Sequence, residues 1–324
     1  MTRTVSGYSF KADDLKVAGR MPGISAFMRI RNGADFLEAT IRSHIGFFDE
    51  IVAVHNQCTD GTPDILERLA SEFGERLKVF HYTDRVFPPG SEGHARTAPD
   101  SPSSMVNYSN FALSQTTRQV VTKLDDDHLA MPEAIAGLLG KMAADPSRAS
   151  RMYSFSGLNL MAGPDGGVGI PESDPVSGSG DIGFFTVRPD SVFTHDRRFE
   201  RVPRIGFQRI FSGFLYWHLK YMKTGHGFAN YELEANPGSR YAARQAAFAE
   251  DRIRLLGLPE LAERMDAGPA LRLSAIFSRK SALILDRNRW IKDNWAGTDL
   301  MQAIRQTTDP AMLEMVLGQA GLRS

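Results

Sequence analysis

The sequence of 324 residues predicts an α/β fold with a mixed, mostly parallel sheet flanked by helices. In its N-terminal half, short apolar runs of strand length alternate with segments whose apolar residues recur every three or four positions. Turns rich in Asn, Asp, Gly and Pro separate these segments. A strand–helix–strand–helix–strand order is typical of a parallel sheet, because parallel neighbours need a crossover connection between them.

The first five elements follow from local pattern. The apolar run Gly23–Ile30 is typical of a buried strand, and Leu37, Ile41 and Ile45 give the next segment helical spacing. Thr62, which precedes a proline, is suited to the start of a second helix. We therefore expect strands at 23–30, 50–54 and 77–82, and helices at 32–47 and 62–73.

The remaining elements are less regular. Segments rich in Gly, Pro and Ser predict long loops at 87–104 and 162–181. The pattern between and after them predicts helices at 105–116, 132–145 and 207–223, strands at 119–124, 151–161 and 182–187, and helices from about 241 to the end.

Composition excludes several classes of protein. Lys plus Arg and Asp plus Glu are 38 each, so the chain lacks the basic excess of a general nucleic-acid binder, and we expect no nucleic-acid partner. One cysteine, Cys58, excludes a disulfide framework within the chain. No apolar segment resembles a signal peptide or a membrane span, so we expect a cytoplasmic protein. The aromatic, lysine-containing segment 207–223 is compatible with peripheral contact at the inner face of a membrane, although a core helix is the preferred interpretation.

An acidic cluster, "LDDDH", follows the strand expected at 119–124. Asp125 and Asp127 are two residues apart, so both point to the same side of an extended segment. Neighbouring carboxylates repel each other unless a cation neutralises them, and Mn²⁺ and Mg²⁺ favour carboxylate oxygens. Asp126 is expected to face away, toward Lys123 or a helix N-terminus, and His128 begins the turn into the next helix. Simple capping of that helix is the alternative interpretation.

Three segments in order resemble the family 2-like glycosyltransferases with a GT-A fold, within the nucleotide-diphospho-sugar transferase superfamily. They are "GISAFMRIRNGADFLEATIRS", "DEIVAVHNQCTDGTPDIL" and "VVTKLDDDHLAMPEAI", and "NYSNFAL" is similar to the helix before the last of them. The resemblance implies a GT-A domain over residues 1–240, with a nucleotide-binding half of about 21–140 and an acceptor half of about 150–240. A C-terminal helical extension is expected over 241–324.

The resemblance also implies an activity and a set of site residues. The activity is transfer of a hexosyl unit from a nucleotide-sugar donor to a glycan or lipid-linked acceptor, in bacterial surface polysaccharide synthesis, with Mn²⁺ or Mg²⁺ as cofactor. A UDP-sugar is favoured, and GDP- and CMP-sugars stay open because His55 and Asn56 stand where acidic residues are usual. The implied metal ligands are Asp125, Asp127 and His218, and the implied donor-binding residues are Arg29, Arg31, Asn32, Asn56, Asp60, Lys123, Asp125 and Asp126.

An inverting transfer needs a carboxylate base to deprotonate the acceptor hydroxyl. The acidic pair usual in the family is missing between residues 151 and 231. The candidates are Asp181, for which a turn role is equally compatible, and Asp196 and Glu200, for which solvated ion pairs with neighbouring arginines are the favoured interpretation.

Two alternatives remain at this point. A nucleotidyltransferase would be expected to carry a Gly-rich basic loop after its first strand, which "RIRNGADF" does not provide. A non-catalytic nucleotide- or sugar-binding module is compatible with the missing acidic pair. The absence of a Gly-x-Ser-x-Gly motif argues against an α/β-hydrolase. The sequence does not indicate an oligomeric state.

Overall fold

The computed structural model describes residues 2–164, 166–178, 183–196, 200–201, 206–228, 233, 240–249, 253–265 and 267–322. The chain divides into two compact units. Unit 1 consists of Met1–Asp126, Thr186–Gly206 and Gly225–Asp251, and unit 2 of Asp127–Phe185, Phe207–Thr224 and Arg252–Ser324.

Unit 1 contains a parallel sheet with the strand order β1-β4-β3-β2-β5. Every residue of β3 is buried, as expected for a strand inside a parallel sheet. The strands are β1 (Arg3–Val5), β2 (Met21–Ile30), β3 (Glu50–Asn56), β4 (Leu77–Tyr82) and β5 (Arg118–Lys123).

Helices connect these strands where the sequence predicts them. In α2, a proline occupies the first turn, where the missing N–H costs no hydrogen bond. The segment 87–104, predicted as a loop, contains the short helix α3, which begins at the serine N-cap Ser91. The helices are α1 (Leu37–His44), α2 (Thr62–Phe73), α3 (Glu92–Arg96), α4 (Met105–Ser114) and α6 (Arg240–Ala249), and a small ribbon joins β12 (Thr194–His195) to β13 (Glu200–Arg201).

Unit 2 contains a mixed sheet in which β7 and β14 pair in parallel. The strand order is β11-β7-β14-β6, and β10 also pairs with β7. A separate small sheet has the order β15-β9-β8. The strands are β6 (His128–Ala130), β7 (Arg151–Asn159), β8 (Met161–Ala162), β9 (Val168–Pro171), β10 (Val176–Ser177), β11 (Gly183–Thr186), β14 (Gln208–His218) and β15 (Leu255–Leu256).

The prediction of a helix at 207–223 is wrong. This segment forms strand β14 and the short 3₁₀ turn Lys220–Met222. Aromatic and aliphatic residues dominate the segment, and a short apolar run has no periodicity that separates a buried strand from a buried helix. Pairing with β7 and β6 on its two sides decides in favour of the strand. The predicted loop 162–181 also differs, because it contains β9 and β10.

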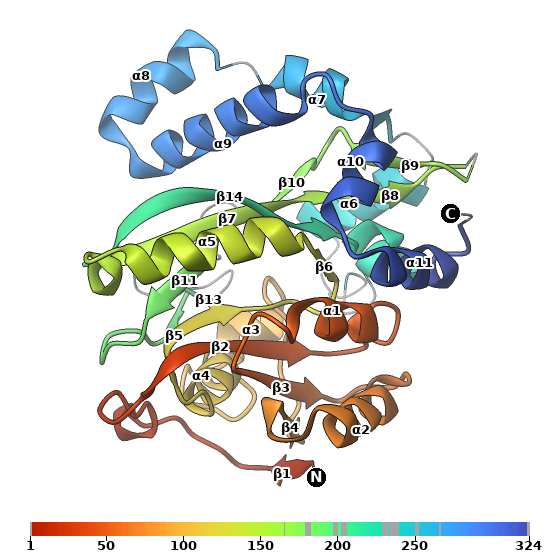
Figure 1. The fold of residues 1–324 in the computed structure, drawn as a ribbon. Helices are drawn as coiled ribbons and strands as arrows, with labels where there is room; N and C mark the ends of the chain where they lie inside the picture. Colours follow the sequence, from red (N-terminus) through yellow and green to blue (C-terminus); the bar gives the residue numbers. More distant parts are fainter. Residues whose placement is uncertain are drawn as a thin grey trace. The chain divides into compact units, whose positions relative to one another are not determined.

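The C-terminal part is helical, as predicted, and the α/β fold class with a mostly parallel sheet is confirmed. Figure 1 shows α5 lying along β14 and α9 packing on the same strand. The helices of unit 2 are α5 (Pro132–Ala144), α7 (Leu258–Arg264), α8 (Pro269–Phe277), α9 (Arg279–Trp295), α10 (Leu300–Thr307) and α11 (Pro310–Gln319). None of the helices in the described ranges has the length and apolar character that crossing a bilayer requires.

An aromatic cluster fixes α9 against the sheet of unit 2. Phe214 of β14 is fully buried and lies with its ring centroid 5.1 Å from that of Trp290 and 5.0 Å from that of Trp295. Trp217 stacks on Trp295 and donates its indole N–H to Thr307 Oγ1 at 3.0 Å. The cluster therefore joins β14, α9 and α10 through packing and one buried hydrogen bond.

Replacing Phe214 with Ala should lower the free energy of unfolding by about 3–5 kcal/mol, because it leaves a cavity beside the rings of Trp290 and Trp295. Urea denaturation measures this change. Phe277→Ala is the matched control, because Phe277 is 85% exposed and should change stability by less than about 0.5 kcal/mol. Equal effects of the two substitutions would contradict this account of the core.

Candidate metal centre

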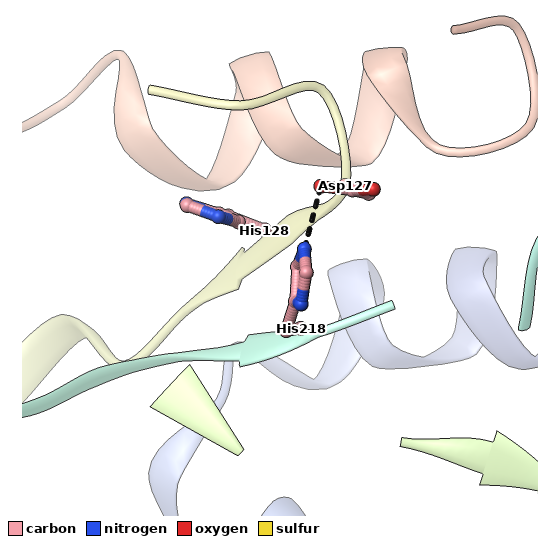
Figure 2. Close-up of side chains that lie close together, drawn as sticks. All are labelled: Asp127, His128 and His218. Carbon is pink, nitrogen blue, oxygen red and sulfur yellow. Dashed lines mark hydrogen bonds and ion pairs between the residues drawn. The ribbon is translucent and has the colours of Figure 1, made fainter. Parts of the chain in front are cut away.

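Asp127, His128 and His218 form a buried cluster in unit 2 (Figure 2). Their exposed fractions are 6%, 1% and 8%. Each offers one potential ligand atom, and these three atoms lie within 4.8 Å of one another. A carboxylate and two imidazoles at this separation are a donor set that can bind a divalent transition-metal ion.

Strand pairing places these three side chains together. β6 runs antiparallel to β14, and His128 lies opposite His218 in the register. Asp127 directly precedes β6, and its carbonyl accepts a hydrogen bond from Leu219 N at 2.8 Å. The ring of His128 stacks on Tyr216, with the ring centroids 3.6 Å apart. The backbone ladder and this stacking fix the positions of the residues before any ligand binds.

Asn159 determines which nitrogen of His218 carries hydrogen. The Asn159 amide Nδ2 donates to the carbonyl of Asp174 at 2.6 Å, so its oxygen faces His218. His218 Nδ1 lies 2.5 Å from that oxygen and must be the donor. In the neutral imidazole, the lone pair of Nε2 is then directed at Asp127 Oδ1, 3.1 Å away. Two acceptors at this distance require a proton or a cation near them, and a carbonyl-anchored imidazole is the usual arrangement of a metal ligand.

Lys223 supplies positive charge to the second oxygen of Asp127. Its Nζ lies 3.0 Å from Asp127 Oδ2, and both side chains are largely buried. Burial acts to raise the pKa of Asp127, but Lys223, His218 and His128 outweigh it and hold that pKa well below its ordinary value. Asp127 is therefore a carboxylate at neutral pH, which is the form that binds a metal.

Of the three predicted metal ligands, the cluster contains Asp127 and His218. Asp125 forms an ion pair with Lys123 instead, with the carboxylate oxygen and the ammonium nitrogen 3.0 Å apart. The carboxylate of Asp126 lies against Gly33. A Cβ atom at position 33 would come within 2.2 Å of Asp126 Oδ2. His218 belongs to a strand and not to the predicted helix.

A second charged group, in unit 1, brings together residues predicted for donor binding and for catalysis. Arg29 forms an ion pair with Glu200 at 2.5 Å and donates to Ser109 Oγ at 2.6 Å. Burial acts to lower the pKa of Arg29, but Glu200 and Asp125 outweigh it and raise that pKa. The pKa of Lys123 is likewise raised, because Asp125 outweighs the effect of burial. Glu200 and Arg29 are each 11% exposed at the side chain, so the expectation of a solvated pair for Glu200 is wrong.

The other two predicted catalytic carboxylates are Asp196 and Asp181. Asp196 pairs with Arg201 at 2.7 Å, and the arginine side chain is 57% exposed, as expected for a solvated pair. Asp181 lies outside the residues that the structure describes.

The remaining predicted donor-binding residues lie in unit 1, at the end of β3 and in the loops after β2 and β3. Asn56 is buried and donates to the carbonyls of Tyr82 and Asp84 at 2.7 and 2.6 Å. Asp60 accepts from the backbone N–H groups of Ala34 and Thr62 at 3.0 and 3.1 Å. Asn32, which has a positive φ of 52°, accepts from Thr59 N at 2.8 Å. Arg31 follows β2 and is half-buried. The contacts of Asn32 and Asp60 hold the loops after β2 and β3 together, and Asn56 joins the end of β3 to the end of β4 and the residues after it.

Three residues in or beside the cluster are absent from the predicted metal site. The sequence predicts that His128 begins a turn, and its strand pairing carries no local signal. Lys223 and Asn159 have no feature in the sequence that separates them from other polar residues at strand ends. All three acquire their positions from contacts between segments far apart in the chain.

Comparisons with known proteins give matches at the level of structure alone. No protein-family model and no curated protein sequence matches this chain. Glucosyl-3-phosphoglycerate synthase from Mycobacterium tuberculosis, solved with Mg²⁺ and uridine diphosphate, matches at 17% identity and a TM-score of 0.27, over 48% of this chain and 50% of its own. The match therefore spans about half the length of that protein.

Two further structures are matched over more of the chain. The same synthase with Mn²⁺, uridine diphosphate and glucosyl-3-phosphoglycerate matches at 15% identity and a TM-score of 0.33, over 67% of this chain and 79% of its own. The mannosyltransferase PcManGT from Pyrobaculum calidifontis, with GDP-Man and Mn²⁺, matches at 14% identity and a TM-score of 0.42, over 93% of this chain and 80% of its own.

Replacing Asp127 with Asn, in the presence of a chelator, should lower the free energy of unfolding at pH 7 by about 3–5 kcal/mol, because Lys223 loses its buried partner. The folded pKa of Asp127 is below the unfolded value, so this contribution is present above about pH 4 and is lost as the pH falls further. Urea denaturation at pH 7 and at about pH 3 measures both values.

The control for this prediction is Asp286→Asn, which removes an exposed carboxylate whose distance to Arg289 is 3.8 Å. It should change stability by less than about 0.5 kcal/mol. A deficit of the Asp127 variant that stays constant or grows on acidification would contradict the assigned charge state.

Proposed function

We propose that this protein is a metal-dependent glycosyltransferase that uses a nucleotide-sugar donor. The observation that carries the proposal is the buried carboxylate–imidazole cluster in which Asn159 directs a lone pair of His218 toward Asp127. Two of its residues, Asp127 and His128, belong to the acidic "LDDDH" motif that resembles the family's metal-binding segment.

Asp127 and His218, with His128 beside them, are the residues that would hold the metal. The ion would neutralise the negative charge of the departing nucleoside diphosphate. The oxygen ligand suits both Mn²⁺ and Mg²⁺, whereas the imidazole nitrogens favour Mn²⁺. Asn159 keeps His218 in the tautomer that can bind a metal, and Lys223 keeps Asp127 ionised.

For the donor, we propose direct roles for Arg29 and Lys123 and positioning roles for Asn32, Asn56 and Asp60. Arg29 and Lys123 are cations that pair with the carboxylates of Glu200 and Asp125. A diphosphate is also an anion and could take the place of these carboxylates. The other three use their polar atoms to hold loops of unit 1 together. A UDP-sugar is the proposed donor, on the strength of the motif resemblance.

The proposed reaction is inverting, with Asp181 as the base that deprotonates the acceptor hydroxyl. Among the other candidates, Glu200 and Asp196 each hold an arginine, which would have to be displaced before either oxygen could take a proton. The proposed acceptor is a hydroxyl group of a glycan or of a lipid-linked sugar, which would place the enzyme in cytoplasmic surface-polysaccharide synthesis. The family resemblance supports these last points.

The test of donor and metal is the change in melting temperature caused by UDP, GDP or CMP, each with and without Mn²⁺. One of these nucleotides should stabilise the wild-type protein in the presence of Mn²⁺, by about 2.7 kcal/mol at a hundred times its dissociation constant. His218→Ala should remove the metal-dependent part of this stabilisation.

His81→Ala is the matched control, because His81 stacks on His55 in unit 1 and belongs to no metal cluster found among the described residues. It should keep the metal-dependent shift. The absence of a shift with every nucleotide, or an unchanged shift in His218→Ala, would refute the proposal. A nucleotidyltransferase would instead release pyrophosphate from a nucleoside triphosphate, and would release no nucleoside diphosphate from a nucleotide sugar.

Asn159→Ala should weaken Mn²⁺ binding roughly 10–100-fold, because His218 loses the acceptor that fixes its tautomer. Isothermal titration with Mn²⁺ measures this effect, and Asn159→Asp should restore much of the affinity, since a carboxylate also accepts from Nδ1. Loss of stability without a change in Mn²⁺ affinity would show that Asn159 acts on folding alone.

A further inference from the structure

Helix α8 leaves large apolar side chains in solvent. Leu273, Ile276 and Phe277 are 63%, 72% and 85% exposed. Their spacing of three and four residues places them on one face of the helix. Among the described residues, Met21 is the only other large apolar side chain that is similarly exposed to solvent. Grouped apolar exposure of this kind marks a contact surface more often than a free surface.

The exposed face is not the face that attaches α8 to the fold. Leu271 and Ala275, on the other side of the helix, are half-buried, and Ser274 Oγ lies 2.7 Å from Ser281 Oγ of α9. Figure 1 shows α8 lying beside α9, which packs in turn on β14. Since no residue of α8 is buried, the outward apolar face contributes little to the stability of the unit.

Positive charge surrounds this apolar face. Arg272, Arg279 and Lys280 are exposed around it. Residues 268–285 contain these three cations and no Asp or Glu. We call Arg272, Leu273, Ile276, Phe277, Arg279 and Lys280 the α8 surface.

We propose that the α8 surface docks on a membrane that contains anionic lipid. Aliphatic and aromatic side chains enter the boundary between headgroups and acyl chains, while neighbouring cations bind acidic headgroups. A second copy of this chain fits less well, because a two-fold contact through the same surface would bring two sets of three cations together. An anionic bilayer offers acyl chains to the apolar side chains of the α8 surface and acidic headgroups to its cations.

This proposal is independent of the proposed function, because vesicle binding is measured without donor or metal. It also concerns a different segment from 207–223, which is an internal strand of the sheet. Failure of the glycosyltransferase assays would leave the membrane prediction intact, and the reverse also holds.

The experiment is co-sedimentation of the full chain with vesicles of phosphatidylcholine alone and of phosphatidylcholine mixed with phosphatidylglycerol. The wild-type protein should bind the mixed vesicles, more weakly as salt is raised. Ile276→Ser with Phe277→Ser should weaken binding roughly a hundredfold or more, because two anchoring side chains are lost. Arg279→Gln with Lys280→Gln should weaken it roughly tenfold on the mixed vesicles, and little on the neutral ones.

Met21→Ser is the matched control, since it removes an exposed apolar side chain from unit 1 and should leave binding unchanged. Unchanged melting temperatures would show that all variants fold. Failure of the wild-type protein to bind mixed vesicles, or equal binding by the double serine variant, would overturn the proposal. A wild-type dimer in sedimentation velocity that the double serine variant abolishes would also overturn it, because the surface would then serve self-association.

Discussion

The pairing of β14 with β7 on one side and with β6 on the other is the constraint on which the candidate metal centre depends. In the parallel ladder, His218 lies opposite Asn159, and in the antiparallel ladder it lies opposite His128. Because a one-residue slip in either ladder would turn these side chains to the other face, the register of the sheet sets the chemistry of the cluster. The aromatic contacts of Phe214 and Trp217 with α9 hold the same strand from outside the ladder.

Burial of charge explains why the cluster is so completely bonded. A carboxylate with 6% exposure is costly unless cations face it, and Asp127 has Lys223 at one oxygen and His218 at the other. Asn159 fixes the hydrogen on Nδ1 of His218, so Nε2 and Asp127 Oδ1 face each other as two ligand atoms that would suit a divalent ion.

In unit 1 the same principle operates with different residues. Arg29 and Lys123 neutralise Glu200 and Asp125, so the cations expected to meet a donor are held ready by carboxylates of the chain. Asn32 and Asp60 accept hydrogen bonds that join the loops after β2 and β3, so both residues stabilise the fold of unit 1.

The sequence by itself determined the parallel α/β core, since the spacing of apolar residues in 23–82 admits few other folds, and it placed an acidic cluster immediately after β5. It also singled out Asp127 and His218. Only the tertiary structure decided that most of 207–223 is a strand, that His128 joins Asp127 and His218, that Asn159 and Lys223 contact this cluster, and that Asp125 pairs with Lys123. One reason is that a short apolar run has the same pattern in a buried helix and in a buried strand. The other is that Asp127 and His218 are 91 positions apart in the chain and meet only through the pairing of strands.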